Sequence, residues 1–516
     1  MLGQRFAFGS FVLNPETGIL VRGGEVLPIG QRAASLLGRL LESPGEVIAK
    51  AELIDAAWPD TAVEESNLSV QIASLRKILG ENPVGGEWIA TVSRVGYRFV
   101  GDVRIHNEAD PSPRLDRAMA SAAEPSIAVL PFANLSEDPE QEYFGEGLAD
   151  DIITGLSRLR WLQVIARNSS FTYGAKNIDV RQVGRELGAG YILEGSVRQS
   201  GQQLRVNAQL SNTSTGLQIW AERYDSETAD ILVLQDQITR SVVASIEPHL
   251  YSAEGSRSHR LAPESLDAWG FVMRAMPYIW TWKASDNEKA LACLKRATEI
   301  DPDYARANAL IAWTYALRLH LGWAPLHESL DMALTFARLA VEQDGEDPWA
   351  HLALGFSHAM LRRSKSAIEE LATSIDLNPS FAFGHAMLGM TYGYAGEAES
   401  GLGHLSLATR LSPRDPQQAR FLSATGLCHL MAGRFAQAVE FERRAVQLRP
   451  HYLAAWRTLA AAAGLSGDRD EAAAALSEAK RLQQDLSIAW IEAYHPIVHE
   501  RDRTMYIKGL RAAGLT

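Results

Sequence analysis

The stretch ESNLSVQIASLRKIL, residues 65–79, decides the fold of the N-terminal part of the chain. Its large apolar side chains recur at helical spacing and share one stripe of a helix: Leu68, Ile72, Leu75 and Leu79. Ser66 or Asn67 is predicted to cap the start of this helix, and Gly80 is predicted to end it. The opposite face carries small and polar side chains. That face can therefore approach another molecule closely.

A predicted hairpin follows this helix. Residues 88–92 and 96–100 alternate between apolar and polar side chains as paired strands do, and the turn between them is basic. A helix followed at once by a hairpin with a basic tip is typical of a winged helix, which reads DNA. The segments before it predict short strands over residues 5–29 and helices over residues 31–42 and 50–58.

The same part of the chain resembles a known family. Residues 5–101 resemble the OmpR/PhoB-type winged-helix DNA-binding domain, through residues 53–59, residues 67–77, and Thr91-Val92 followed by Gly96-Tyr97-Arg98-Phe99. In that family the third helix enters the major groove, and the hairpin, called the wing, reaches the adjacent minor groove. The resemblance implies a winged helix-turn-helix domain of the α+β class over residues 1–101.

The resemblance also implies which side chains contact DNA. Base contacts are expected from Ser66, Val70, Gln71 and Ser74, phosphate contacts from Asn67, Arg76, Lys77, Thr91 and Tyr97, and wing-tip contacts from Ser93 and Arg94. The family often has several arginines on the third helix, whereas this chain has Ala73 and Ser74 there. Readout by bidentate arginine is therefore expected to be weak. Gln71 (suited to adenine), Arg94 in the groove and DNA shape remain as sources of specificity.

The charge of the chain restricts how it meets DNA. The 516 residues carry a net charge of −12, so DNA contact is expected from a local patch rather than from the overall field. Residues 1–101 hold nine Lys or Arg against eleven Asp or Glu. This balance leaves open an alternative in which the domain contacts a protein, such as RNA polymerase, instead of DNA.

Several features predict a cytoplasmic protein without a cofactor or metal. Cys293 and Cys428 are too few and too far apart for a disulfide framework or a zinc cluster. The start lacks a signal peptide, and no segment has the ~18 uninterrupted apolar residues of a membrane span. Residues 102–125 are polar, small and proline-bearing, which predicts a flexible linker. The arrangement resembles regulators of the ToxR/CadC kind, but those carry a spanning helix after the winged helix.

Residues 126–250 predict a second domain. Strands are expected over residues 127–132 and 162–166, each followed by a helix, and then come three strands and a helix from about 231 to 246. This order predicts an α/β or α+β sandwich with a mixed sheet. Three segments resemble the N-terminal domain of the TolB family and a module of some class III adenylate cyclases: residues 127–134, 144–156 and 190–197. The resemblance implies a fold and no chemistry.

Catalytic readings of this second domain are weak. The glycines at Gly145 and Gly147 are not followed by the Gly-Lys-Ser/Thr of a phosphate loop. Asp150 and Asp151 are adjacent, so on a helix their side chains point apart. Ser196 lacks the second glycine of a nucleophile elbow. We expect no catalytic residue here, and small-ligand binding stays open.

Residues 265–516 are repetitive, with a 34-residue period. The clearest unit, residues 382–415, places Gly389, Tyr392, Leu405, Ala408 and Pro413 as the tetratricopeptide repeat (TPR) does. About six such units are predicted to stack into an all-α solenoid, with residues 487–516 as a cap. Repeats of this kind have no chemistry of their own and bind proteins or peptides in a concave groove.

The favoured hypothesis is a non-enzymatic, cytoplasmic regulator whose winged helix reads operator DNA as a dimer. Its expected partners are double-stranded DNA, a protein or peptide in the repeat groove, RNA polymerase, and a second copy of the chain. The alternative is a scaffold whose winged helix binds protein. A third hypothesis, an adenylate cyclase, rests only on the resemblance of residues 126–516 to cyclase-attached regions, and no cyclase catalytic domain fits in the rest of the chain.

Overall fold

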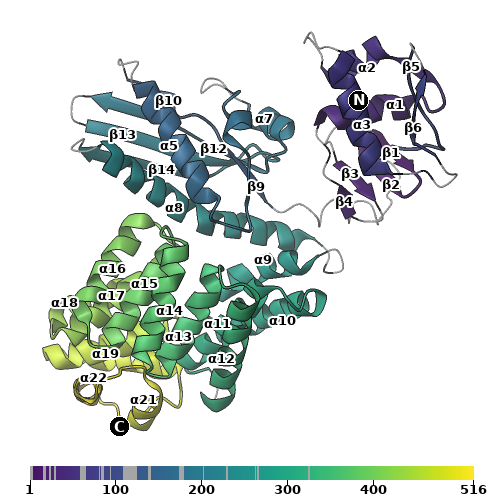
Figure 1. Ribbon diagram of the computed structural model, residues 1–516. Helices are drawn as coiled ribbons and strands as arrows, with labels where there is room; N and C mark the ends of the chain where they lie inside the picture. Colours follow the sequence, from purple (N-terminus) through teal and green to yellow (C-terminus); the bar gives the residue numbers. More distant parts are fainter. Residues whose placement is uncertain are drawn as a thin grey trace. The chain divides into compact units, whose positions relative to one another are not determined.

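The computed structural model describes residues 4–15, 19–22, 25–27, 29, 31–58, 65–80, 82, 86–92, 95–107, 125–136, 141–173, 179–200, 203–227, 231–261, 263, 266–323 and 326–516. The chain divides into two compact units, Met1–Glu124 and Pro125–Thr516 (Figure 1). Among the described residues, no helix has the length and apolar character needed to cross a membrane.

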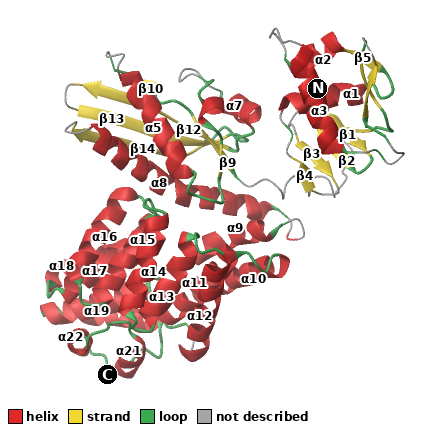
Figure 2. Cartoon of the chain, viewed as in Figure 1, coloured by secondary structure: helices red, strands yellow, loops and turns green. Residues whose placement is uncertain are grey.

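The first unit combines helices with two small antiparallel sheets (Figure 2). One sheet has the order β4-β3-β2-β1-β8 and the other the order β5-β7-β6. The helices are α1 (Gln31–Glu42), α2 (Lys50–Ala57) and α3 (Glu65–Leu79). The strands are β1 (Gln4–Phe8), β2 (Phe11–Asn14), β3 (Ile19–Arg22), β4 (Glu25–Leu27), β5 (Val47–Ala49), β6 (Ile89–Val92), β7 (Gly96–Phe99) and β8 (Arg104–Asn107).

The predicted stripe of α3 forms part of the core of this unit. Leu68, Ile72, Leu75 and Leu79 are all at most 1% exposed, and they join a core that includes the aromatic cluster of Phe8, Phe11, Trp88 and Phe99. Gly80 ends the helix with a left-handed backbone (φ 67°), as predicted. The start differs by a residue or two: α3 begins at Glu65, so Ser66 and Asn67 lie in its first turn and do not precede it.

The predicted linker is wrong at its beginning. Residues 104–107 form β8, which pairs antiparallel with β1, with Phe6 opposite Ile105. The strand brings the chain back to the first sheet after the hairpin, a long-range pairing that local composition does not indicate. Residues 108–124 of the predicted linker lie outside the described residues.

The second unit begins with a mixed six-stranded sheet of order β11-β9-β12-β13-β14, in which β10 also pairs with β12. β9 is parallel to its neighbours β11 and β12, whereas β12, β13 and β14 are antiparallel. The strands are β9 (Ser126–Val129), β10 (Ala133–Asn134), β11 (Gln163–Val164), β12 (Tyr191–Ser200), β13 (Gln203–Asn212) and β14 (Gln218–Glu227). The helices are α5 (Gln141–Leu156), α6 (Arg167–Ser170), α7 (Val180–Leu187) and α8 (Ile231–Arg260).

Successive side chains of a strand point to opposite faces of the sheet, and different helices cover the two faces. Tyr191 and Leu193 belong to the large core that includes residues of α5 and α8, whereas Ile192 between them packs in a small cluster with Val183 of α7. This layered arrangement agrees with the mixed α/β fold predicted from the sequence.

Helix α8 is longer than predicted. The sequence predicted an end near residue 246, but α8 continues through Pro248 to Arg260. Its second half packs closely on α9 (Ala268–Ile279), since a Cβ at Gly255 would lie 2.6 Å from the Pro277 side chain. The sheet domain and the repeats therefore share one continuous core.

Within the described residues, the remaining helices form six hairpin-like pairs followed by α21 and α22 at the predicted cap (Figure 1). After α9 come α10 (Ala284–Ile300), α11 (Ala305–His320), α12 (Leu326–Gln343), α13 (Pro348–Met360), α14 (Ser364–Leu377), α15 (Ala382–Tyr394), α16 (Ala398–Leu411), α17 (Gln418–Met431), α18 (Phe435–Leu448), α19 (Leu453–Ser466), α20 (Arg469–Leu482), α21 (Ile488–Tyr494) and α22 (Glu500–Ala512). The repeated small residues mark close approaches, because a Cβ at Gly389 of α15 would lie 2.8 Å from the Gly401 carbonyl oxygen of α16.

Early and late repeats touch one another. The ring centroids of Trp282 and Tyr452 are 4.4 Å apart, and Arg457 donates to the carbonyl oxygen of His320 at 2.7 Å. Arg420 is fully buried, with its guanidinium about 5 to 6 Å from the rings of Trp282, Trp313, Phe383 and Tyr452. The protein's own side chains thus fill this part of the repeat interior. A partner in the repeat groove stays a prediction.

Candidate nucleic-acid interface

The outer face of α3 is the first candidate site. Asn67, Val70, Ser74 and Lys77 are exposed, and Gln71 lies at the flank with intermediate exposure. Val70 is 65% exposed although it is apolar and stands in the middle of a well-packed helix. The helical period that buries Leu68 and Ile72 dictates this exposure. The side chain of Ser66 lies outside what the structure describes.

Arg76 has a different position from the other predicted contacts. Its Nε and Nη2 donate to the carbonyl oxygen of Ile89 at 2.9 and 2.7 Å, and Nη2 donates to Thr91 Oγ1 at 2.7 Å. Its Nε also lies 2.9 Å from the Glu87 carboxylate. The guanidinium therefore connects α3 to β6, the first strand of the wing, and fixes the angle between them.

The hairpin presents its predicted contacts unequally. Thr91 and Tyr97 are directly opposite across β6 and β7, but Thr91 is exposed while Tyr97 is 6% exposed and part of the core. Ser93 and Arg94, the predicted wing-tip contacts, lie outside the described residues. Arg98 is exposed between buried Tyr97 and Phe99, and the prediction had not included it. The strand alternation could have placed it on the outer face.

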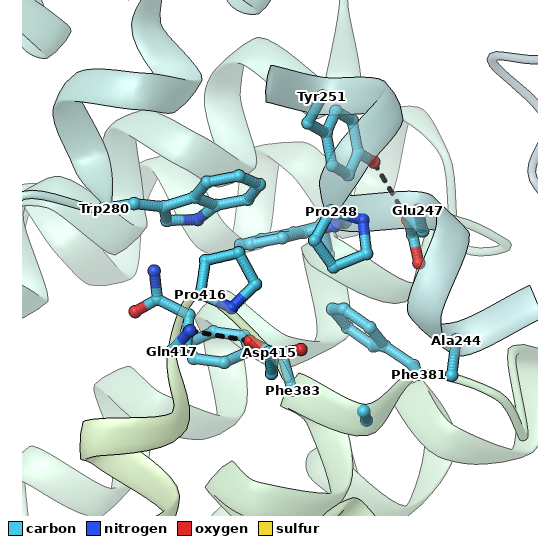
Figure 3. Close-up of a pocket in the computed structure, with 12 residues that line it drawn as sticks. Ala244, Glu247, Pro248, Tyr251, Trp280, Phe381, Phe383, Asp415, Pro416 and Gln417 are labelled. Atoms are coloured by element: carbon cyan, nitrogen blue, oxygen red, sulfur yellow. Dashed lines mark hydrogen bonds between the residues drawn. The ribbon is translucent and has the colours of Figure 1, made fainter. Parts of the chain in front are cut away.

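A second candidate site lies where α8 meets the repeats (Figure 3). The walls of this junction pocket are largely aromatic: Tyr251, Trp280, Trp349, Phe381 and Phe383. Gln417 also lines it, and neither polar atom of its buried amide has a hydrogen-bond partner among the described residues. The pocket joins the last helix of the sheet domain to the first residues of α13 and α15 and to the residues just before α17.

Two carboxyl groups line the junction pocket. Burial raises the pKa of Glu247 to about 7, against the opposing effects of the Arg306 charge and the hydrogen bond from Tyr251. Burial also raises the pKa of Asp415 to about 6, although this carboxylate accepts a 2.7 Å hydrogen bond from the Gln417 backbone. The neutral form of both groups is therefore favoured more than it is in water.

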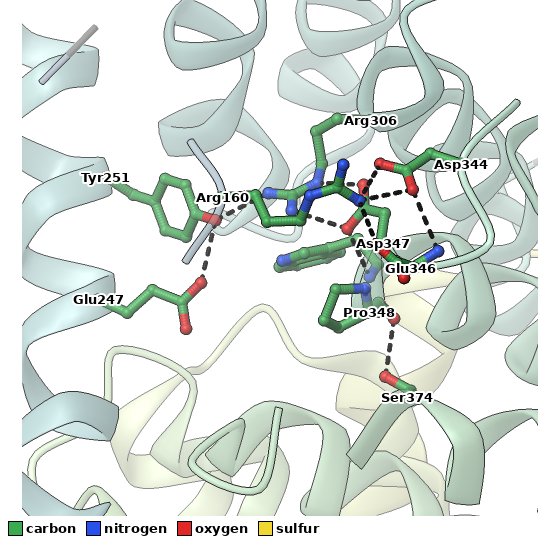
Figure 4. A network of polar contacts seen from close by, with 10 residues as sticks. Arg160, Glu247, Tyr251, Arg306, Asp344, Glu346, Asp347, Pro348 and Ser374 are labelled. Atoms are coloured by element: carbon green, nitrogen blue, oxygen red, sulfur yellow. Dashed lines mark hydrogen bonds and ion pairs between the residues drawn. The ribbon is translucent and has the colours of Figure 1, made fainter. Parts of the chain in front are cut away.

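A polar network extends from the junction pocket into the repeats (Figure 4). Tyr251 donates to Glu247 at 3.0 Å and accepts from Arg306 Nη1 at 2.9 Å. Arg306 also forms a bidentate pair with Asp347, with both distances 2.7 Å. Asp347 caps α13 by accepting from the backbone of Trp349 at 3.0 Å. Nearer the surface, Arg160 pairs with Asp344 at 2.6 Å.

Comparison with protein families identifies the domain that carries α3. Residues 24–99 match the family model described as "Transcriptional regulatory protein, C terminal". The first unit is an OmpR/PhoB-type winged helix. The matched residues include α3 and the hairpin of β6 and β7.

The sheet domain matches a different model from the one expected. Residues 122–241 match "HilA/YgeH-like transcriptional regulator, second domain". The winged helix is thus followed by a domain also found in a transcriptional regulator. The TolB resemblance stays a prediction.

Individual relatives match parts of the chain. The chain is 41% identical over 262 residues to a protein of Rhizobium meliloti (strain 1021) named adenylate cyclase 3, a match that covers 50% of this chain and 43% of that protein. It is 23% identical over 354 residues to transcriptional regulator HilA of Salmonella typhimurium (strain LT2), covering 68% of this chain and 60% of that one. The solved DNA-binding domain of E. coli CadC is 27% identical, with 20% of this chain and 100% of that domain covered and a TM-score of 0.19. The chain therefore spans less than two thirds of the two relatives' own lengths.

Proposed function

We propose that this chain is a cytoplasmic transcriptional regulator whose winged helix reads operator DNA and whose second unit senses a signal or partner. The observation that carries the proposal is the outer face of α3. Its side chains are small and exposed, and the helix belongs to a winged helix. Arg76 holds the helix against the wing through hydrogen bonds to Ile89 and Thr91. Binding as a dimer, with RNA polymerase as a further partner, belongs to the same proposal.

The second unit supplies the regulation in this proposal. The junction pocket lies between α8 and the repeats, so a small ligand there would act on the contact between the two parts of the unit. Regulator-type family models over residues 24–99 and 122–241 support a role without catalysis. A protein or peptide partner that binds the repeats would act on the same second unit at a different surface.

Selection of binding sites from random duplex DNA by the full-length chain tests the DNA-binding role. We expect one enriched sequence, bound with an affinity that falls steeply as salt rises, because phosphate contacts release counterions. The full chain is preferable to a fragment ending at residue 101, since such a fragment would remove β8 from the first sheet. Binding that is neither sequence-selective nor salt-sensitive would refute the proposal.

A second candidate function is a scaffold whose winged helix contacts protein. The charge balance of residues 1–101, nine basic against eleven acidic, and the internal use of Arg76 favour it. The variant Lys77→Ala with Arg94→Ala separates the two functions. Unchanged regulation by this double variant would support the scaffold, and its loss together with DNA affinity would support the DNA reader.

A further inference from the structure

The outer face of α3 lacks the side chain that most often reads guanine. Arg76 is the only arginine of the sequence between residues 65 and 79. Its guanidinium is bonded to Ile89, Thr91 and Glu87 on the wing side of the helix. Arginine and lysine are the side chains that contact the two major-groove acceptors of guanine. Arg76 would have to break these bonds to do so, and exposed Lys77 is expected to contact phosphate.

Apolar groups take the place of that arginine. Val70 and Ala73 are both exposed, and their spacing of three residues puts them side by side on consecutive turns. Val70 is more exposed than Val95 (52%) and Val47 (39%), the other exposed large apolar side chains described in the first unit. Exposed methyl groups at the centre of a DNA-facing helix can contact another methyl group, and thymine is the base that presents one in the major groove.

The polar neighbours fit the same base pair. Gln71, at the flank of this face, can bond adenine with its amide, which offers one donor and one acceptor. Ser74 is exposed on the next turn and can bond either kind of base. Adenine and thymine form one base pair, so the apolar and polar groups of α3 favour the same sequence.

We propose that α3 reads an A·T-rich operator core, with Val70 and Ala73 contacting thymine methyl groups and Gln71 contacting adenine. This inference rests on the proposed function, because it takes α3 to lie in the major groove. It names the class of sequence that the interface recognises: base pairs distinguished by a methyl group rather than by guanine acceptors.

The test uses the full-length chain and the duplex that it selects from a random pool. Each thymine of the selected core is replaced in turn by deoxyuridine, which removes the methyl group and keeps the pairing edge. We expect about fourfold weaker binding for each contacted methyl group, from the usual gain on burying one such group. Replacing a contacted T·A pair by 5-methylcytosine·G should bind more tightly than the unmethylated C·G pair at that position.

Two variants assign the methyl contact to its residue. Val70→Ala should bind the thymine duplex more weakly and should lose most of the sensitivity to deoxyuridine at one position. Lys77→Ala, the matched control on the same face, should weaken binding to both duplexes by the same factor. Both side chains are exposed, so neither change disturbs the core, and circular dichroism checks that the variants are folded.

The possible outcomes distinguish the thymine-methyl readout from the DNA-binding function on which it rests. A G·C-rich selected core, or an A·T-rich core insensitive to deoxyuridine, overturns the methyl readout while leaving DNA binding in place. Equal sensitivity in Val70→Ala and the unmodified chain also overturns it. Absence of any selected sequence refutes the proposed function itself.

Discussion

The outer face of α3 and the junction between α8 and the repeats use charged residues in opposite ways. On α3 the exposed face is small and apolar at its centre, and its only arginine is turned inward to the wing. At the junction, Arg306 and Asp347 are largely buried, with side chains 13% and 6% exposed, and buried Glu247 is linked to them through Tyr251. The first region keeps its arginine off the exposed face, and the second region places charged groups in a core.

This difference separates two physical roles. A surface contact is made only when a partner arrives, so the exposed groups of α3 affect binding more than they affect folding. A buried charge must instead be compensated inside the protein, because removing it from water costs several kcal/mol per ion. Substitutions at the junction should therefore change stability, whereas those on α3 should divide between the two effects according to what each side chain contacts.

The largest expected effect comes from Asp347→Ala. This change leaves Arg306 as a buried cation without its bidentate partner and removes the cap of α13, so the free energy of unfolding should fall by about 3–5 kcal/mol. Asp344→Ala is the matched control on the same loop, since its pair with Arg160 is much more exposed and should contribute less than about 1 kcal/mol. Urea unfolding followed by helix circular dichroism measures both.

Equal destabilisation by the two variants would contradict this comparison. It would mean that the loop before α13, and not burial of the Arg306 pair, determines the stability lost. Double replacement of Arg306 and Asp347 by apolar residues distinguishes the cases further. It should recover most of the loss, because the penalty lies chiefly in the unpaired charge.

A smaller, pH-dependent effect is expected for Glu247→Gln. The pKa of Glu247 is raised from 4.5 to about 7 in the folded protein. The folded state therefore holds a proton that the unfolded state has lost, so this group's stabilising contribution is present below pH 4.5 and is lost as pH rises through about 7. Glutamine cannot ionise and should escape that loss.

The measurement compares unfolding of the parent chain and the variant in urea at pH 5 and pH 8.5. From pH 5 to pH 8.5, the free energy of unfolding of the variant should rise relative to that of the parent chain by an amount on the order of 3 kcal/mol. One pKa unit corresponds to about 1.4 kcal/mol. Parallel stability profiles would show that the buried carboxyl does not titrate differently on folding. The charge at the junction would then be compensated in some other way.

The sequence predicted what depends on local periodicity and missed what depends on distant contacts. The buried stripe of α3, the exposure of Val70 and the end at Gly80 all follow from spacing within one helix. Arg76 stays a predicted phosphate contact, but nothing local reveals that its guanidinium also bonds Ile89 and Thr91.

The junction was beyond prediction for the same reason. Arg306 pairs with Asp347 across 41 positions and with Tyr251 across 55, so neither partner stands in its own helix. The far half of α8 was missed because Pro248 resembles a helix end, whereas packing on α9 keeps the helix intact. The repeat pattern gives the helices but not the side chains that close their interior.

Arg76 and Lys77, adjacent on α3, offer the finest test of the contrast between folding and binding. Arg76→Ala removes hydrogen bonds between helix and wing, so local stability should fall by about 1.5–3 kcal/mol. Hydrogen–deuterium exchange of the full chain should then show faster exchange in residues 65–79 and 89–92. Lys77→Ala should leave exchange unchanged but weaken binding on every DNA sequence and lower the salt slope by about one. The opposite result is that Arg76→Ala keeps its protection from exchange and loses DNA affinity as Lys77→Ala does. Arg76 would then leave the wing to contact phosphate in the complex. The thymine readout, which depends on an Arg76 held against the wing, would lose its basis.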